Sequence, residues 1–479
     1  MWDSCLILLS GLGLAVVVKG IVAEKKRNPR GLPLPPGPKG LPLLGNIFQL
    51  PQVLPWEGYR DLCKEYGDIM YLNALGQGIL VLGSQRRAVD LLDKRATNYS
   101  DRPVIPIADM MNFGWNFGLM PYGGMWRQHR RSFHQLLNNN VVQRYHPIIY
   151  EETKAFLRIL KSHPEGVFEH LQSLFGTTIM RTAYGFDDLR QNESLIHNAE
   201  TLSSAFIEAA VPGKFLVNIF PFLKHVPSWL PGAGFQKHFA ELAQLSFKTV
   251  NSPFEEAKRD FNRAELETVA RNVCSVAYIA GVDTASSSGI ALLYVLASYP
   301  HVQAKAQAEI DTVIGSDRLP LVTDRAELPY VHAIVKEVSR WYTVVPLGVA
   351  HANAEADEYE GYFIPKGTFV LQNNWAMMHD PELFDQPFEF NPERYLRKDG
   401  QIDPSVPDAE AAAFGHGRRI CPGRHFSNDT LFAMAAFLLA TYNVSAPKDE
   451  DGNVIPMKLE LKNPAIRGKT FNLILIRNM

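Results

Sequence analysis

Apolar and polar residues alternate along Ile69–Ser84 in a pattern that predicts a β-hairpin. Most of the rest of the chain has helical spacing instead. The segment Arg263–Tyr299 contains no proline over about ten turns, and apolar residues surround its second half, so we expect a helix buried on all sides. No repeat or second linker follows Trp56. These patterns predict a mostly α fold with a minor β part (α+β), in one large domain.

The N-terminus is continuously apolar from Cys5 to Val18, and a basic cluster follows it at Lys25, Lys26, Arg27 and Arg30. A cleaved signal peptide is one interpretation, but no small-residue cleavage site follows the apolar run. We therefore favour a membrane anchor helix over residues 1–23, although it is short for a full span. The basic cluster would keep the remaining chain on the cytosolic side.

Prolines are dense between Leu32 and Gly45, where they exclude a helix and favour a semi-rigid extended strip. We interpret residues 24–45 as a basic and Pro-rich linker between the anchor and the folded body. Residues 46–479 then form the catalytic domain.

Composition narrows the possible functions. The formal net charge is −2, without the basic bias that is typical of nucleic-acid-binding proteins. The four cysteines are scattered and form no CxxC pair, so neither a zinc site nor a disulfide framework is indicated. Such sparse cysteine usage fits a reducing compartment.

One cysteine, Cys421, stands in an unusual sequence, FGHGRRICPG. The residues after it predict a helix with Pro422 at its first position, so the thiol would lie at a helix N-terminus, where its pKa is lowered. Neighbouring glycines allow tight backbone conformations close to a flat ligand. Taken alone, a buried structural cysteine is the more common alternative.

Five residues of this segment, Phe414, Gly417, Arg419, Cys421 and Gly423, resemble the haem-binding signature FxxGxRxCxG of the cytochrome P450 superfamily. The resemblance implies a cytochrome P450 fold with haem b as cofactor and Cys421 as the proximal thiolate ligand of its iron. It also implies that Arg419 pairs with a haem propionate and that Phe414 packs near the sulfur.

A second segment, KEVSR, places Glu337 and Arg340 three residues apart, hence as neighbours on a helix, with Glu337 inside the apolar stripe. Most such pairs are solvated and contribute little. Here the pair resembles the ExxR of the same superfamily, and FNPERY resembles the segment that supplies Arg394. The implied triad serves folding and haem loading rather than catalysis.

A third segment, AGVDTAS, sets Asp283 and Thr284 in an otherwise apolar helix. A mid-helix threonine often bonds the carbonyl one turn back, which would be a purely structural role. The segment also resembles the superfamily pattern [AG]-G-x-[DE]-T. This implies that Asp283 and Thr284 are catalytic, delivering protons for cleavage of the O–O bond, and that Gly281 leaves room for oxygen and substrate.

Four more residues resemble propionate ligands of the superfamily. Trp126 and Arg130, four apart in MWRQHRR, match its WxxxR and share a helix face. His351 stands where the superfamily has a propionate-binding His or Arg, and Arg102 is a further candidate. Without the cysteine motif, surface or core roles would be the simpler interpretation for all four.

The chain looks closest to fungal microsomal members. The resemblance therefore implies an O2-dependent monooxygenase at the endoplasmic reticulum membrane, facing the cytosol. Electrons would come from NADPH through a partner, NADPH–cytochrome P450 reductase, which carries the flavins. Arg127 and Arg131 are either docking residues for this acidic partner or simply solvated. Two alternatives are a haem-thiolate isomerase or peroxygenase that works without a reductase, which the intact Asp283–Thr284 pair disfavours, and a non-catalytic haem or lipid carrier.

The superfamily's substrate-contacting regions correspond here to Ile105–Pro121, Leu202–Phe222, the face near Ala277 and Ala280, Val344–Val349 and Pro464–Ile466. Nearly all are apolar, so we expect a lipophilic small-molecule substrate, with terpenoid or polyketide secondary metabolism as a guess from the family.

Two further segments are notable. The apolar segment Phe215–Phe235 predicts either a second membrane contact or ordinary core, and we favour the membrane contact. Between Phe247 and Arg263 the chain is shorter than the superfamily normally allows.

Overall fold

The computed structural model describes residues 27–186, 189–210, 214–258, 267–457, 459 and 474–477. The expected anchor over residues 1–23 lies outside the described residues, as does the proposed substrate contact at Pro464–Ile466. The segments that resemble motifs of the superfamily all lie inside the described residues.

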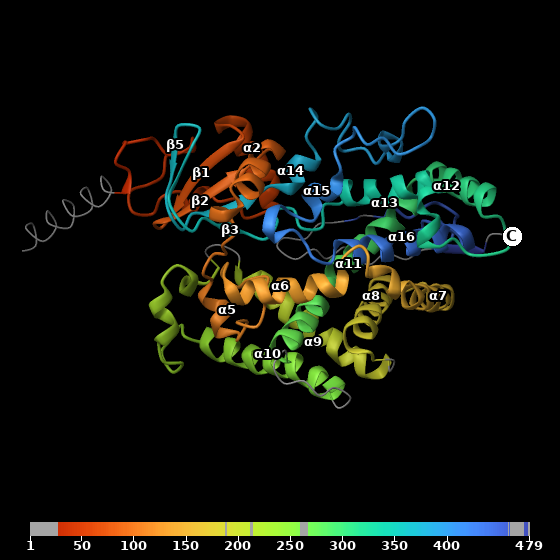
Figure 1. Ribbon diagram of the computed structural model, residues 1–479, viewed down its shortest axis with the longest axis horizontal. Helices are drawn as coiled ribbons and strands as arrows, with labels where there is room; N and C mark the ends of the chain where they lie inside the picture. The colour runs from red at the N-terminus through yellow and green to blue at the C-terminus, as the bar shows by residue number, and fades with distance from the viewer. Residues whose placement is uncertain are drawn as a thin grey trace, which may run out of the picture.

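The predicted hairpin is confirmed. Strands β1 (Ile69–Ala74) and β2 (Gln77–Leu82) pair antiparallel, and β2 then pairs in parallel with β6 (Phe369–Gln372), which carries the short β3 (His351–Ala352) on its other edge. In Figure 1 this sheet and helix α2 lie at the upper left, and most of the other helices lie below and to the right of it.

Helices form the rest of the fold, in agreement with the expected mostly α architecture. Their bounds are α2 Pro55–Tyr66, α3 Gln85–Ala88, α4 Ala96–Tyr99, α5 Pro106–Met110, α6 Gly124–Leu137, α7 His146–Ser162, α8 Val167–Tyr184, α9 Leu189–Ala210, α10 Phe235–Lys258, α11 Glu267–Ser298, α12 Pro300–Val313, α13 Pro329–Trp341, α14 Asn374–Met378, α15 Ala409–Ala413 and α16 Arg424–Thr441. Two further strand pairs are β4 Asp357–Tyr359 with β5 Tyr362–Ile364, and β7 Tyr442–Ser445 with β8 Ile474–Arg477.

Short 3-10 helices and one π-helical turn connect these elements. The 3-10 helices are η1 Ile47–Gln49, η3 Val142–Tyr145, η4 Leu216–Asn218, η5 Pro221–His225, η7 Val322–Ala326, η8 Pro392–Tyr395 and η9 Gly417–Arg419. The π-helical turn is η2, Val89–Lys94.

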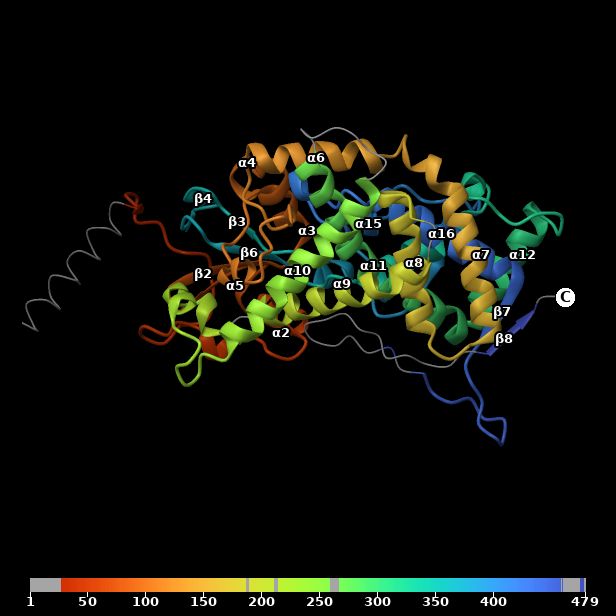
Figure 2. The same ribbon diagram turned by 90° about the horizontal axis from the view of Figure 1, so that it is seen from below.

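Helix α11 is the long helix predicted from the sequence, and it lies at the centre of the helical part (Figures 1 and 2). It contacts α6, α8, α9, α10, α13 and α16. Of the described helices it is the one that is long and apolar enough to cross a membrane, but 67% of its most apolar window is buried inside the protein. A helix packed on every side needs apolar residues all round, so its composition follows from its central position.

The Pro-rich strip is extended, as predicted, and it lies along the sheet. The carbonyl of Pro36 accepts a hydrogen bond from the Tyr71 amide at 2.8 Å, and that of Pro33 accepts one from the Phe363 amide at 2.8 Å. A Cβ at Gly37 would lie 2.1 Å from the Tyr71 carbonyl oxygen, so only glycine allows this approach. The segment interpreted as a linker is therefore bonded to the folded body.

The short segment before α11 is only partly described. Helix α10 extends to Lys258 and α11 begins at Glu267, while residues 259–266 lie outside the described part of the chain. The first half of the region expected to be trimmed is thus helical.

Candidate functional site

The cysteine loop, residues 414–423, is a compact turn between α15 and α16. The amide of Cys421 donates a 2.7 Å hydrogen bond to the carbonyl of Phe414, which closes the loop. Gly415 and Gly417 have positive φ angles of 77° and 58°. A Cβ at Gly417 would lie 2.0 Å from the Leu92 carbonyl oxygen. Both conformation and space therefore require glycine at Gly417.

The helix after Cys421 begins later than the sequence predicts. Helix α16 starts at Arg424 with Gly423 as its N-cap residue, so Pro422 is not its first residue. Pro422 and Gly423 instead form the turn that leads into the helix. Cys421 still precedes the helix closely enough for the amides of Gly423 and Arg424 to approach its sulfur.

The expected lowering of the thiol pKa is wrong for Cys421 as it stands in this fold. Burial raises its pKa and outweighs the opposing effects of the Gly423 and Arg424 amides and of the Arg130 and Arg424 guanidinium groups. Those four groups would instead stabilise a thiolate once a metal ion has displaced the proton, because a coordinating thiol is deprotonated.

A cluster of buried cations adjoins the cysteine loop. The guanidinium of Arg419 donates to the carbonyls of Ser100 at 2.8 Å and Met120 at 2.7 Å. The guanidinium carbon of Arg419 lies 4.5 Å from the centre of the Trp126 ring, so the positive charge of Arg419 lies over the face of this ring. Arg130 lies one turn further along α6 and interacts electrostatically with Cys421.

Arg102 and His351 complete the cluster. Arg102 donates to the carbonyls of Gly118, Val349 and Ala350 at 2.9, 2.6 and 2.7 Å. The Nδ1 atom of His351 lies 2.8 Å from the Tyr99 carbonyl, and burial holds the pKa of His351 well below its usual value. His351 is therefore neutral near pH 7, with Nδ1 as donor and Nε2 as acceptor.

The positive charge of this cluster is only partly compensated. Burial and the neighbouring Arg419 lower the pKa of Arg102 to about 9, and burial lowers that of Arg419 to about 10; in both cases the Asp101 carboxylate opposes the shift without cancelling it. In the described part of the chain Arg102, Arg130 and Arg419 form no ion pair with a carboxylate. Buried guanidinium groups that lack an ion-paired carboxylate favour an anionic ligand. The donor set thus fits the two propionates of haem, and the thiol of Cys421 fits its iron.

Helix α11 supplies the polar residues of the third motif. Ala280 and Thr284, one turn apart, are exposed although most of this helix is buried. The Thr284 hydroxyl donates to the Ala280 carbonyl at 2.8 Å, the bond expected of a structural mid-helix threonine. Asp283 lies partly buried, with the Gln172 side-chain nitrogen 3.5 Å from its Oδ1.

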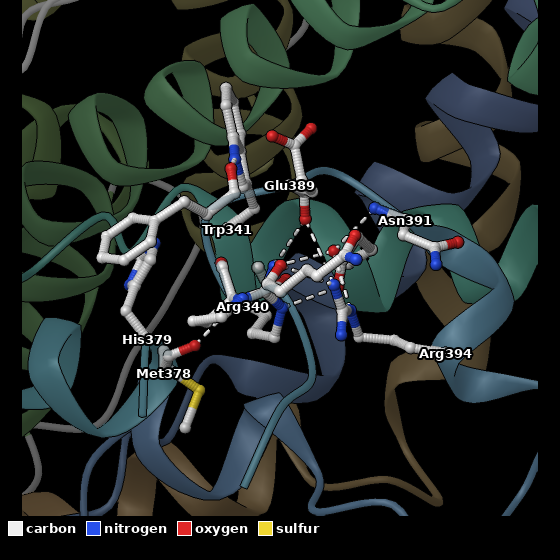
Figure 3. Close-up of polar contacts among 12 residues, drawn as sticks. Arg340, Trp341, Met378, His379, Glu389, Asn391 and Arg394 are labelled. Carbon is white, nitrogen blue, oxygen red and sulfur yellow. Dashed lines mark hydrogen bonds and ion pairs between the residues drawn. The ribbon is translucent and has the colours of Figure 1, made fainter. Parts of the chain in front are cut away.

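The second motif forms a buried ion-pair network (Figure 3). Glu337 binds Arg340 through two hydrogen bonds of 2.7 and 2.8 Å and Arg394 through one of 3.1 Å. The side chains of Glu337 and Arg340 are 0% exposed. Arg340 also donates to the carbonyls of Met378 and Pro387 at 2.8 and 2.7 Å. The structure therefore brings together the three residues that the sequence paired.

The comparisons with known proteins agree with this geometry. The sequence matches the family model described as Cytochrome P450 over residues 35–469. The chain belongs to the cytochrome P450 family. Membership implies haem as cofactor and agrees with the observed helical fold with small sheets.

Fungal P450 monooxygenases are similar to this chain over nearly their whole length. The cytochrome P450 monooxygenase COX1 of Coprinopsis cinerea is 53% identical over 489 residues, which cover 96% of this chain and 94% of that protein. COX2 of the same fungus is 42% identical, over 93% of this chain and 88% of its own. The cytochrome P450 monooxygenase claR of Ampulloclitocybe clavipes is 38% identical, over 88% and 82%. The chain is thus a cytochrome P450 monooxygenase.

Two of the expected substrate-contacting segments of this P450, Ile105–Pro121 and Leu202–Phe222, meet in its helical core. The ring of Phe113 lies 5.3 Å from that of Phe206 and 5.6 Å from that of Trp115. The indole nitrogen of Trp115 donates to the Ser246 hydroxyl at 3.0 Å, which ties this loop to α10. Helix α5 contacts α9, α10, η4 and η5. These contacts bring three distant parts of the sequence together around apolar side chains.

Some contacts of the site have no sequence signal. Asp93 accepts hydrogen bonds from the cysteine loop, and Gln172 is the described amide neighbour of Asp283. Both contacts join residues more than 100 positions apart, and neither residue belongs to a motif. Single-sequence patterns cannot reveal such pairs.

Proposed function

We propose that this P450 is a haem-thiolate monooxygenase that hydroxylates a lipophilic small molecule with electrons passed from NADPH by a flavoprotein reductase. The supporting observation is the position of Cys421 beside buried arginines whose positive charge is only partly offset by Asp101. Haem bound there would supply the activation of O2. Terpenoid or polyketide secondary metabolism remains our proposal for the substrate class.

The proposed roles follow from the contacts of each residue. Cys421 would hold the iron through its sulfur, while Arg102, Arg130, Arg419 and the acceptor-competent His351 would hold the propionates. Trp126 orients Arg419 by stacking on it. Phe414 fixes the conformation of the loop through its carbonyl bond to Cys421.

We propose that the Thr284 hydroxyl and the Asp283 carboxylate hold and pass on the protons that the reaction needs. The exposed Thr284 hydroxyl donates its single hydrogen to the Ala280 carbonyl, so it can accept a hydrogen bond from a ligand in this position and can donate to one only after that bond is released. The Gln172 side-chain amide contacts the Asp283 carboxylate at 3.5 Å and helps to orient it. A carboxylate next to a hydroxyl is a suitable pair for proton transfer.

We propose that the reductase docks near α6. Arg127 and Arg131 are both exposed on this helix, whose other face carries Trp126 towards Arg419. Arg418 is exposed beside them on the cysteine loop and lies over the ring of Tyr122, as Arg127 does. An acidic flavoprotein surface would be attracted to this basic face.

The reaction class is tested with the full chain and a P450 reductase in lipid vesicles. With NADPH and labelled O2, a panel of lipophilic compounds should yield a product heavier by one labelled oxygen. Omitting the reductase should stop the reaction. Product formation from hydrogen peroxide but not from NADPH would instead support the peroxygenase alternative, and a bound compound that never changes would support a carrier.

Replacing Thr284 by alanine in this assay should lower product formation by about a hundredfold, because proton delivery typically contributes 10²-fold or more. NADPH consumption should continue and yield peroxide or water, so the ratio of product to NADPH is the informative measurement. Ser288→Ala, one turn further along α11, is the matched control and should keep the wild-type ratio. An unchanged ratio in the Thr284 variant would reject its proposed role.

We further propose a membrane-facing end of the molecule. Apolar side chains on and after η4 and η5 are strongly exposed, with Phe222 at 67% and Trp229 at 78%. Leu43, Phe48 and Val53, near the Pro-rich strip, are 94%, 79% and 79% exposed. Figures 1 and 2 both place these two segments at the same end of the molecule. With an anchor at residues 1–23, this end would face the endoplasmic reticulum membrane from the cytosol.

The proposal predicts that Trp229 enters the lipid headgroup region. Trp2 belongs to the proposed anchor, so the test uses the full chain with Trp2→Phe. In vesicles that contain shallow spin-labelled lipids, the tryptophan fluorescence of this chain should be partly quenched, and adding Trp229→Phe should remove most of that quenching. Trp375, which is 6% exposed, provides the control, because Trp375→Phe should leave the quenchable part unchanged. Equal quenching with and without Trp229→Phe would contradict membrane contact at this site.

A further inference from the structure

The cysteine loop lies along the segment Asp93–Ser100, which the sequence analysis does not single out. His416 and Gly417 both bond to the Asp93 side chain. Arg418 then donates to the Thr97 hydroxyl at 3.0 Å, and Arg419 donates to the Ser100 carbonyl at 2.8 Å. Successive residues of the loop thus bond to positions of this segment that are three or four residues apart.

Asp93 is the acidic residue of these contacts and uses both carboxylate oxygens. Its Oδ1 accepts from the Gly417 amide, and its Oδ2 lies 3.3 Å from Nδ1 of His416. An ionised acceptor makes a hydrogen bond roughly twice as strong as a neutral one. One carboxylate therefore fixes two successive residues of the loop, four and five positions before Cys421.

The backbone geometry around Asp93 suits this role. Asp93 lies in the π-helical turn η2, and such turns are rare and often occur at functional sites. The preceding carbonyl, that of Leu92, lies so close to Gly417 that a Cβ there would be at 2.0 Å. The turn and the loop therefore touch through their backbones, and Asp93 bonds across that contact.

The His416 side chain is buried and has one ring nitrogen that does not contact Asp93. It is 3% exposed, and its Nε2 has no hydrogen-bond partner among the described residues. Because Nδ1 faces the Asp93 carboxylate, Nδ1 carries the proton and Nε2 is an acceptor. Besides Asp93 on η2, His351 on β3 is the titratable group that faces His416 among the described residues.

We infer that Asp93 and His416 form a positioning clamp that holds the cysteine loop in the conformation in which Cys421 binds iron as a thiolate. This inference rests on the proposed ligation of haem by Cys421. Asp93 acts through the loop and touches neither haem nor substrate, so it is a positioning residue rather than a catalytic one. Without its carboxylate, the Gly417 amide and the His416 ring would lose their shared acceptor.

Hydrogen exchange on the full haem-loaded chain tests the clamp directly. In Asp93→Ala the Gly417 amide should exchange on the order of tenfold faster under native conditions, because it loses a bond to a charged acceptor. The reduced carbon monoxide complex of the same sample should show a smaller share of the red-shifted band of a thiolate-ligated haem. Asp93→Asn keeps one acceptor oxygen and should lie between the wild type and the alanine variant in both measurements.

Lys94→Gln is the matched control, since Lys94 is 69% exposed and bonds Asp90 rather than the loop. It should match the wild type in loop exchange and in the carbon monoxide spectrum. If Asp93 variants only lowered the unfolding temperature, with loop exchange and thiolate share unchanged, the clamp would be refuted. Loss of the band in a Cys421 variant tests the ligand separately, so the two proposals can fail independently.

Discussion

Replacing Cys421 by alanine is expected to abolish the red-shifted Soret band of the reduced carbon monoxide complex and all NADPH-dependent turnover. Among the described residues no second thiol lies at this place, since Cys63 lies near Gly83 and Cys274 bonds the Ala183 carbonyl on a different element. A water or nitrogen ligand would not push electron density onto the iron as a thiolate does. The measurement is the difference spectrum of the purified full chain, with haem content determined on the same sample.

Cys63→Ala serves as the control for this experiment. Cys63 lies on α2 and packs against apolar residues of β1 and β2, away from the cysteine loop, so it is not a candidate ligand. Its variant should keep the full band and full turnover. Survival of the band in Cys421→Ala would show that another group binds the iron and would overturn the proposed site.

The second large effect is expected at Glu337. Glu337→Gln leaves Arg340 and Arg394 in place without their shared carboxylate, and Arg340 is completely buried. Breaking a buried ion pair in this way typically costs about 3–5 kcal/mol. That is a large part of the 5–15 kcal/mol by which a domain is typically stable. Urea unfolding should show the loss, and the ratio of haem to protein absorbance should fall.

Glu393→Gln provides a matched comparison one residue before Arg394. The Glu393 carboxylate pairs with Lys305 at the surface, where both side chains are more than half exposed. Such exposed pairs contribute about 0–1 kcal/mol, so this variant should load haem normally. Equal stability of the two glutamine variants would mean that the triad does not stabilise the fold as we propose.

Much of the fold could be predicted because its signals are local. The hairpin of β1 and β2 follows from alternation, and α11 follows from a long apolar run without proline. The pairing of Glu337 with Arg340 follows from their spacing of three residues. What connects these elements could not be predicted from patterns. The parallel pairing of β2 with β6 joins strands nearly 300 residues apart.

In the candidate site, too, local features could be predicted from the sequence and long-range contacts could not. The five signature residues lie on one loop, so their spacing in the sequence was sufficient to group them. The start of α16 at Arg424 depends on the turn geometry at Gly423, which a proline rule does not capture. The direction of the Cys421 pKa shift depends on how much protein surrounds the sulfur. Asp93 was missed because its partner is 324 positions away.

The bonding of the Pro-rich strip to the sheet limits how far the catalytic body can move from a membrane. With residues 1–23 as the proposed anchor and Pro33 already bonded to Phe363, only residues 24–32 connect the two. Fully stretched, that tether reaches at most about 30 Å. The hydrogen bonds between Asn28 and Leu32 fold part of it into a turn and shorten the reach further. The catalytic body would therefore stay within this distance of the membrane, with the edge of its sheet always near the lipid surface.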